Sequence, residues 1–372
     1  MKNIGLIVPA LMALTLELIS ATNAGATTYR ITSLGPGKAY SISNNGAIVG
    51  NTVVNTTSQN WLSYGGVTYD LGDCSPSGVN LSGTVTGVVG LPNPVTTIYR
   101  ACTRTSDTTS VLPSLPKTWE ERGIAINDDG LVVGWSRVPV GQQQTVYSHA
   151  CKWDDSGAHD LGTLSTGEQT SVACAVNNNG IIAGWSDNNR GYARACIWDN
   201  NGIHDLGTLN ADVNANRYSY AYGINESGQV VGYSSTPSGP PSDRAYHAFI
   251  WDSNSGMRDL GSNSPMNDSF AWDINNTGQV VGSWRMRDRL DNHACIWNPD
   301  GSITTLGELP GYTRSEALSI NDNGEIVGYL YGPGMYPNEC AVIWTPVPEP
   351  SSIFTLLCGV SSLSLLALKK RK

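Results

Sequence analysis

The side chains best suited to bind a ligand are aromatic, arginine and amide residues that gather between the copies of a repeated motif. Tryptophan and tyrosine dominate the aromatic residues, with 11 and 16 members against 3 phenylalanines. Flat rings can stack on sugar rings, while guanidinium and amide groups hydrogen-bond sugar hydroxyls. The alternative is that these residues are ordinary members of a loop-rich surface. The candidate ligand-binding residues are Trp119, Arg137, Tyr147, Arg190, Tyr192, Arg244, Tyr246, Trp284, Arg287, Tyr312 and Tyr331.

No sequence motif of catalysis or metal binding accompanies these residues. The sequence lacks Gly-x-Ser-x-Gly, His-Glu-x-x-His, Cys-x-x-Cys and the phosphate-binding loop. His149, His247 and His293 occupy one repeated position, so they lie in different repeats and do not converge on one metal. The turn at 128–130 resembles part of a calcium loop but lacks the alternating ligands and the closing glutamate. We therefore expect no catalytic residue, no metal site and no cofactor.

An internal repeat must position the candidate residues, and it is the strongest feature of the sequence. The pattern Ile-Asn-x-x-Gly-x-Val/Ile-Val-Gly occurs, with some variation, seven times. Most copies are followed by Ala-x-x-Trp, a turn and Leu-Gly. The glycine that ends each Asn-rich turn allows the positive φ of a tight reversal. The copies begin at Ile42, Val79, Ile126, Val176, Ile224, Ile274 and Ile320.

Each repeat predicts four short strands, and four strands in about 45 residues are typical of a β-propeller blade. A stacked β-solenoid is the main alternative. The seventh repeat lacks its fourth strand, whereas segment 28–35 has a fourth-strand sequence with no other strands before it. Pairing these two ends would close a ring and remove exposed sheet edges. We therefore expect an all-β fold, a seven-bladed propeller of four-stranded blades over 27–346, with the N-terminal strand closing the last blade.

Three sets of repeated residues are expected to serve the architecture. The third-strand tryptophans are most simply blade packing, and the asparagines of the Ile-Asn motif are most simply turn formers. One set of cysteines shares a single repeat position, which places its members too far apart to form disulfides with one another. The tryptophans are Trp61, Trp153, Trp198, Trp251, Trp297 and Trp344, and the asparagines are Asn80, Asn127, Asn177, Asn225, Asn275 and Asn321. These cysteines are Cys102, Cys151, Cys196 and Cys295, and the states of Cys74, Cys174 and Cys340 stay open.

The repeats over about 29–345 resemble the HAF family of extracellular repeats. The resemblance rests on segments such as 221–232, which reads Ala-Tyr-Gly-Ile-Asn-Glu-Ser-Gly-Gln-Val-Val-Gly, and on the Ala-x-x-Trp and Leu-Gly elements. It implies an exported repeat protein with no established enzymatic activity. Ser43 in an asparagine position and Arg104 in a tryptophan position depart from the pattern.

The two ends of the chain carry targeting features. Lys2, an apolar run over 4–19 and a small-x-small pattern at 24–26 predict a cleaved signal peptide over 1–26, with an uncleaved anchor as the alternative. Segment 347–372 holds Pro348-Glu349-Pro350, an apolar stretch over 353–368 and a basic tip. This order resembles the PEP-CTERM sorting signal, which implies a transmembrane helix over 353–368 and processing by an exosortase. A plain single-pass tail anchor is the alternative.

Net charge argues against a nucleic-acid partner. The whole chain has 22 basic and 31 acidic residues and a formal net charge of −9. Without Lys2, Glu17, Glu349 and the four terminal cations, 17 basic and 29 acidic residues remain, which gives −12. A phosphate backbone would be repelled by this balance.

Loop lengths point to one face of the propeller as the site of recognition. The turns between strands one and two, and between three and four, are short. The connections between strands two and three, and several crossings between blades, are long and varied, and strand alternation places both classes on one face. Recognition usually lies in such loops. We expect an exported, non-enzymatic surface or matrix protein that binds polysaccharide or a surface protein. A purely structural propeller and a polysaccharide lyase or hydrolase are the alternatives.

Overall fold

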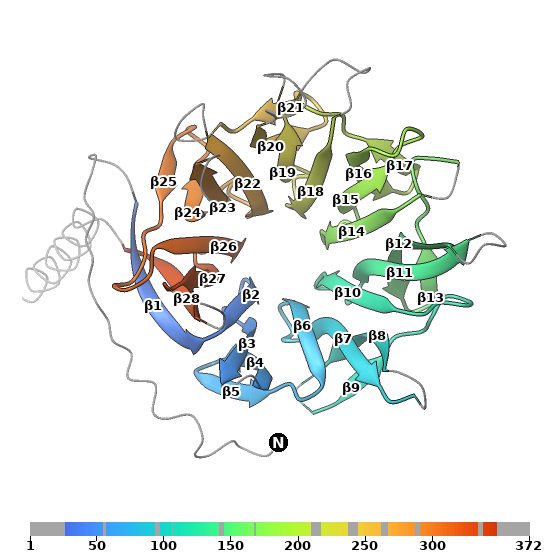
Figure 1. The fold of residues 1–372 in the computed structure, drawn as a ribbon, viewed down its shortest axis with the longest axis horizontal. Helices are drawn as coiled ribbons and strands as arrows, with labels where there is room; N and C mark the ends of the chain where they lie inside the picture. Colours follow the sequence, from blue (N-terminus) through green and yellow to red (C-terminus); the bar gives the residue numbers. More distant parts are fainter. Residues whose placement is uncertain are drawn as a thin grey trace, which may run out of the picture.

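Seven four-stranded antiparallel sheets surround a central axis in the computed structural model (Figure 1). The model describes residues 27–54, 57–93, 97–105, 107–140, 145–166, 169–209, 217–236, 245–261, 267–286, 291–333 and 338–347. Within these ranges no helix is long and apolar enough to cross a membrane. The predicted signal peptide and nearly all of the predicted sorting segment lie outside the described residues. The predicted seven-bladed propeller is confirmed, and the solenoid alternative is excluded.

Each blade is an up-and-down meander whose first strand lies nearest the axis and whose fourth strand lies at the rim. Blades 1 and 2 contain β2 (Lys38–Ile42), β3 (Ile48–Val54), β4 (Thr57–Tyr64), β5 (Val67–Asp70), β6 (Cys74–Val79), β7 (Val85–Leu91), β8 (Ile98–Arg104) and β9 (Thr109–Val111). Blades 3 and 4 contain β10 (Glu121–Ile126), β11 (Val132–Val140), β12 (Thr145–Asp154), β13 (Gly157–Asp160), β14 (Ser171–Val176), β15 (Ile182–Asp187), β16 (Ala193–Asp199) and β17 (Gly202–Asp205).

The remaining blades have the same plan. Blades 5 and 6 contain β18 (Ser219–Ile224), β19 (Val230–Ser235), β20 (Tyr246–Asp252), β21 (Gly256–Asp259), β22 (Asn267–Ile274), β23 (Val280–Met286), β24 (His293–Trp297) and β25 (Ile303–Thr305). Blade 7 contains β26 (Arg314–Ile320), β27 (Ile326–Tyr331), β28 (Glu339–Val347) and β1 (Thr28–Pro36). The N-terminal β1 pairs antiparallel with β28, with Ile31 opposite Trp344, so the predicted closure of the last blade is confirmed.

The hydrophobic core is divided among the seven joints between neighbouring blades. Each of seven buried clusters draws apolar side chains from two adjacent blades. Between blades 3 and 4, Val133 packs with Ala173, Ile182 and Trp198. The indole N–H of Trp198 also donates to the carbonyl oxygen of Leu161 in blade 3 at 3.0 Å. The repeated tryptophans are therefore blade packing, as predicted. Trp61 packs too but does not share their register, because it lies opposite Gly50 and Ser63 stands in the tryptophan position.

A glycine in the second strand allows the inner strand to lie close. In blade 5 a Cβ on Gly232 would overlap the carbonyl oxygen of Tyr220 on β18. The inner strand also changes register beside this glycine, between Ala221 and Gly223. The glycine of the Val-Val-Gly pattern is therefore required because the first and second strands approach too closely for a residue with a Cβ atom.

The asparagines of the Ile-Asn motif form turns, as predicted, and they also tie each blade to the next. Oδ1 of Asn225 accepts a hydrogen bond from the Gln229 N–H at 3.0 Å, which closes the turn. Its Nδ2 group donates to the carbonyl oxygen of Asn275 in the following blade at 3.2 Å. Equivalent bonds link six of the seven joints, and we call them the asparagine clasp.

The joint between blades 1 and 2 differs from the other six. Its donor position holds Ser43, whose hydroxyl donates within its own turn to Asn45 Oδ1 at 2.6 Å. In place of the clasp, Nδ2 of Asn45 donates to the carbonyl oxygen of Leu81. The departure of Ser43 from the repeat pattern therefore removes one cross-blade bond.

Replacing Asn225 by alanine should lower the free energy of unfolding by about 1–3 kcal/mol, because the Asn275 carbonyl and the Gln229 N–H lose their partner. Asn225 is 3% exposed, so water does not readily replace the amide. Urea denaturation measures the change, with Asn254→Ala on an exposed turn as the control. An equal effect of the two substitutions would contradict the clasp.

The reciprocal substitution, Ser43→Asn, supplies the missing donor opposite the Asn80 carbonyl. It should raise the free energy of unfolding by about 0.5–1.5 kcal/mol in the same denaturation experiment. A lower denaturation midpoint for Ser43→Asn would count against the assignment.

Candidate functional site

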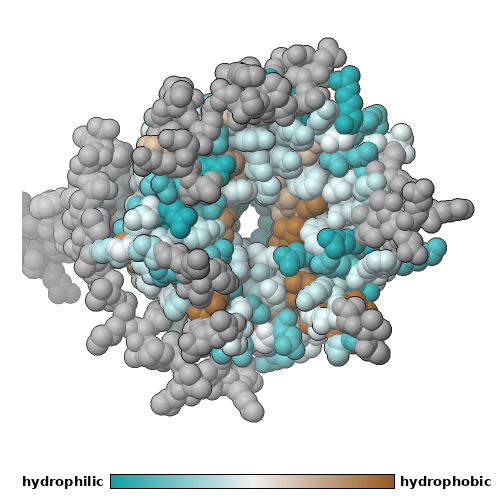
Figure 2. All heavy atoms as spheres, in the orientation of Figure 1, coloured by the Kyte–Doolittle hydropathy of each residue, from teal (hydrophilic) through white to brown (hydrophobic). Residues whose placement is uncertain are grey.

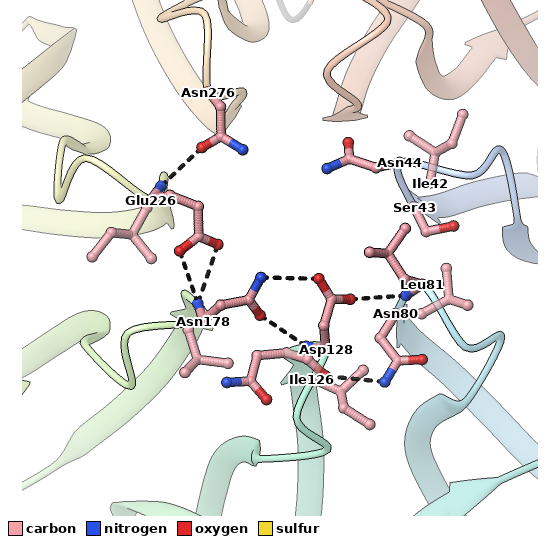
Figure 3. Close-up of a pocket in the computed structure, with 14 residues that line it drawn as sticks. Ile42, Ser43, Asn44, Asn80, Leu81, Ile126, Asp128, Asn178, Glu226 and Asn276 are labelled. Atoms are coloured by element: carbon pink, nitrogen blue, oxygen red, sulfur yellow. Dashed lines mark hydrogen bonds between the residues drawn. The ribbon is translucent and has the colours of Figure 1, made fainter.

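The long connections emerge on one face of the ring, as the strand alternation predicted. Blades run anticlockwise in Figure 1 and clockwise in Figure 3, so these views are from opposite faces. Figure 3 looks onto the turns between first and second strands, which we call the turn face. The opposite, long-connection face carries the connections between strands two and three and the crossings between blades. The candidate ligand-binding residues that the structure describes all lie toward this second face.

Trp119 and Arg137 meet beside blade 3 on the long-connection face. Trp119 is 57% exposed, and Tyr99 of blade 2 is 47% exposed. Nη1 of Arg100 donates to the carbonyl oxygens of both residues, at 3.0 and 3.2 Å. Arg137 forms a 2.8 Å ion pair with Glu120. The result is two exposed aromatic side chains, joined through their backbones by Arg100, beside one ion pair, and such groups are suited to contact a sugar surface. We call them the Trp119 platform.

A larger group of aromatic rings lies along the first two strands of blades 4 to 6. The ring centroids of Tyr222 and Trp272 are 4.8 Å apart, and those of Tyr233 and Phe270 are 5.1 Å apart. Trp185 meets Tyr220 at 5.4 Å. We call this group the aromatic arc. It consists of Trp185, Tyr220, Tyr222, Tyr233, Phe270 and Trp272.

Strand alternation turns the rings of the innermost strands toward the channel. On β18, Ser219, Ala221 and Gly223 are buried, whereas Tyr220 and Tyr222 between them are half-buried. An innermost strand is covered by its own blade and its neighbours, so the exposed part of these rings faces the axis. Figure 2 shows an opening at the centre of the long-connection face with apolar residues at its rim.

Burial keeps the tyrosines of the arc neutral. It raises the pKa of Tyr220, Tyr222 and Tyr233 above the usual value of 10.0, because the phenolate form loses hydration. The phenol groups therefore keep their protons at physiological pH, and the hydroxyls of Tyr222 and Tyr233 are hydrogen-bonded to each other.

Three of the candidate residues lie at the margins of the arc. Tyr246 meets Tyr233 edge-on at 5.7 Å. Tyr192 packs against Tyr218 of the next blade at 5.5 Å. The hydroxyl of Tyr331 donates to that of Tyr329 at 2.9 Å. The structure therefore brings these candidates together around rings that the sequence analysis did not select.

Blade 7 connects Tyr331 to the arc through a buried carboxylate. Tyr329 donates its hydroxyl to Glu316 Oε2 at 3.0 Å, and the indole N–H of Trp272 donates to Oε1 at 3.0 Å. Glu316 is only 8% exposed. The members of the arc lie on strands, whereas the residues predicted from the sequence were taken from the long connections, so the prediction did not include them. A signal did exist, since aromatic residues concentrate in the inner strands of blades 5 and 6.

The other candidates are not gathered into one site. Trp284 stacks on His293 at 4.7 Å, and its N–H contacts Thr305 Oγ1 at 3.4 Å. Tyr312 packs against the joint between blades 6 and 7. Tyr147 is half-buried and Arg190 is exposed. Arg244, Arg287, Pro348, Glu349 and Pro350 lie outside the described residues.

The turn face holds a pocket of about 210 Å³ at the axis (Figure 3). Amide and carboxylate side chains alternate around it, and each accepts a hydrogen bond from the preceding blade, as Asp128 Oδ1 does from the Leu81 N–H at 2.9 Å. Nδ2 of Asn178 returns a bond to Asp128 Oδ2 at 2.9 Å. These groups are already paired, so the pocket is part of the closure of the ring. The order around it is Asn44, Leu81, Asp128, Asn178, Glu226, Asn276 and Asp322.

The histidines of the shared repeat position pair with acids inside their own blades. Nδ1 of His149 lies 2.8 Å from Asp160, and Nδ1 of His247 lies 2.8 Å from Asp259. Among the described residues there is no group of three or more His, Cys, Asp or Glu side chains suited to hold a metal.

The seven described cysteines are free thiols. Cys74 and Cys102 are both buried in blade 2, with their Sγ atoms 3.3 Å apart. Cys340 contacts Ser33 Oγ at 3.1 Å. The sequence left open the states of Cys74, Cys174 and Cys340. The structure shows Cys74 and Cys340 as buried thiols and Cys174 as a half-buried thiol.

The fold defines the class of protein, a seven-bladed β-propeller. Residues 114–331, more than half of the chain, match the family described as protein of unknown function (DUF3466), and the chain belongs to this family. No curated protein matches it. The resemblances to HAF repeats and to the PEP-CTERM signal stay predictions.

Several solved propellers are similar in fold. Streptogramin B lyase matches with a TM-score of 0.48 and 10% identity, over 85% of this chain and 94% of the lyase. Acylaminoacyl peptidase from Pyrococcus horikoshii matches with a TM-score of 0.49 and 10% identity, over 86% of this chain and 53% of the peptidase. The chain thus spans about half of the peptidase. These similarities carry no statement about activity.

A half-buried aspartate at the joint between blades 6 and 7 gives a pH-dependent contribution to stability. Burial raises the pKa of Asp273 from 3.8 to about 6, although Ser319 Oγ and the Ile320 N–H donate to its carboxylate at 2.9 and 3.0 Å. Because the folded pKa lies above the unfolded value, the stabilisation is complete below pH 3.8 and is lost as the pH rises through about 6.

Unfolding of the wild type and of Asp273→Asn should therefore be compared by urea denaturation from about pH 4 to 7. The wild type should lose up to about 3 kcal/mol relative to the variant across this interval. A difference between the two proteins that stays constant with pH would contradict the assignment.

Proposed function

We propose that this protein is exported to the cell surface or extracellular matrix and binds polysaccharide, or another surface protein, through its long-connection face without catalysing a reaction. The observation that carries the proposal is the concentration of accessible aromatic rings on that face. Trp119 is the most exposed large apolar residue among those described, at 57%. Aromatic platforms and arcs suit sugar rings, whose apolar faces stack on them.

Export is supported by the two ends of the sequence. The leader over 1–26 has the charge, apolar run and small residues of a signal peptide. The tail over 347–372 combines Pro-Glu-Pro, an apolar stretch and a basic tip. On this proposal an exosortase processes the tail, which holds the protein at the membrane beforehand. The acidic domain makes a nucleic-acid partner unsuitable.

Binding is favoured over catalysis by the state of the acidic groups beside Trp119. Glu120 is held by Arg137. Glu121 is fully buried and accepts hydrogen bonds from Ser114 Oγ at 2.7 Å and Thr118 Oγ1 at 3.1 Å. A carboxylate engaged in this way serves local structure and is not poised to protonate a glycosidic bond.

Screening the purified domain against a glycan array should reveal binding to at least one polysaccharide. Trp119→Ala should weaken that binding about three- to tenfold, because a stacking surface is lost. Tyr192→Ala and Trp284→Ala test two further positions on the same face. The control is Tyr64→Ala, since Tyr64 is 43% exposed at a turn on the opposite face.

Retention of full glycan binding by all three variants of the long-connection face would refute its role. A wild-type domain that binds no glycan but captures a surface protein through the same residues would favour the purely protein-interaction alternative. Release of new reducing ends or unsaturated sugars would favour the enzymatic one.

A further inference from the structure

We infer that the aromatic arc is a saccharide site that receives the end of a neutral oligosaccharide chain, inserted into the central channel from the long-connection face. The inference rests on the proposed function and adds where the sugar binds, how it enters and which class of sugar fits. None of the six arc residues was among the candidates from the loops.

The arc offers stacking surfaces in several orientations. Phe270 and Trp272 lie nearly parallel, at an interplanar angle of 10° and a centroid distance of 6.2 Å. Tyr222 stands at 76° to Trp272, and Tyr233 at 81° to Phe270. These rings come from two adjacent blades, and Trp185 extends the arc into a third. A sugar on the axis would thus meet both ring faces and ring edges.

The arc is held in place before any ligand arrives. Oε1 of Glu316 accepts from the Trp272 indole and lies 3.5 Å from Ser283 Oγ. Oε2 accepts from Tyr329 at 3.0 Å and from Asn292 Nδ2 at 3.4 Å. Glu316 is therefore a positioning residue, which fixes the indole through its N–H group. Fixed rings lose little side-chain entropy on binding, which favours affinity.

The charge within the arc favours a neutral sugar, although Lys38 lies over the Tyr329 ring at 4.2 Å and Arg314 over the Tyr331 ring at 4.9 Å at its margin. The carboxylate of Glu316 lies at one end of the arc, and the exported part of the chain carries a net charge of −12 by its sequence. Arg285 lies over the Phe270 ring at 4.9 Å, but Asp268 pairs with it at 3.5 Å. A uronic acid would gain no free cation from this pair and would meet the Glu316 carboxylate.

The direction of entry follows from the two ends of the channel. On the turn face, the polar groups of the axial pocket are paired with one another across blades, as Asn276 Nδ2 is with Asp322 Oδ2 at 2.9 Å. On the long-connection face, Tyr246 and Tyr331 mark the margins of the arc. The chain end enters here, and the rest of a long chain passes over the Trp119 platform.

The experiment titrates the purified domain with neutral cellohexaose, maltohexaose and chitohexaose and with anionic hexagalacturonate, read by tryptophan fluorescence and calorimetry. Arc variants are Phe270→Leu and Tyr222→Leu. Tyr64→Ala on the turn face is the matched control. Circular dichroism and thermal unfolding of each variant confirm that it is folded.

The expected result is binding of a neutral hexamer that Phe270→Leu and Tyr222→Leu weaken about tenfold, while Tyr64→Ala changes it less than threefold. For the matching polymer, saturation should follow the number of chain ends and not the mass of sugar. Loss of binding in Glu316→Gln with an unchanged thermal midpoint would further support the positioning role.

Hexamer binding that both arc variants leave intact, preference for hexagalacturonate, or saturation by sugar mass would overturn the inference while the proposed function stands. Absence of binding to every glycan, in the hexamer titrations and on the array, would overturn both the inference and the polysaccharide-binding form of the proposed function.

Discussion

The joint between neighbouring blades is the interaction on which the whole ring depends. A single four-stranded sheet leaves both faces apolar and cannot fold alone, so each must be covered by its neighbours. Seven buried clusters, one at each joint, meet this need. The pairing of β1 with β28 lets the seventh joint form from the two ends of the chain. The strand pairing of blade 7 therefore secures the closure of the ring.

The turn face shows how an odd number of blades affects that closure. Carboxylates and amides alternate around the axis because an amide can donate to an acid on either side of it, as both Asn276 and Asn44 do to Asp322 Oδ2. Acids and amides cannot alternate strictly around a ring with an odd number of positions. The position that breaks the alternation holds Leu81. The clasp is missing at the same joint, where Ser43 replaces asparagine. Both irregularities thus fall at one place, beside the blade whose third strand has Arg104 in the tryptophan position.

Because the turn face serves to close the ring, the long-connection face is available for recognition. The turns, the second-strand glycines and the tryptophans are committed to closing and packing the ring. The long connections and the channel side of the inner strands are not needed to close or pack the ring. Their side chains therefore vary from blade to blade. Aromatic residues concentrate in blades 4 to 6, where Tyr222 and Trp272 occupy equivalent positions on neighbouring strands. Asymmetry within a symmetric scaffold is how a ring of repeats forms a single site.

The sequence by itself determined the repeat, the four strands of each blade, the closure by the N-terminal strand and the packing role of the tryptophans. These follow from local turn chemistry and from period-two burial, which are written into short stretches of sequence. Only the tertiary structure decided that Asn225 bonds to Asn275, or that Tyr222 meets Trp272 and, through it, Glu316. Such contacts join residues on separate blades, and their geometry depends on the angle and closeness of neighbouring sheets, which no local spacing records. The lengths of the loops predicted the long-connection face, whereas the aromatic arc became visible only from the packing of the inner strands.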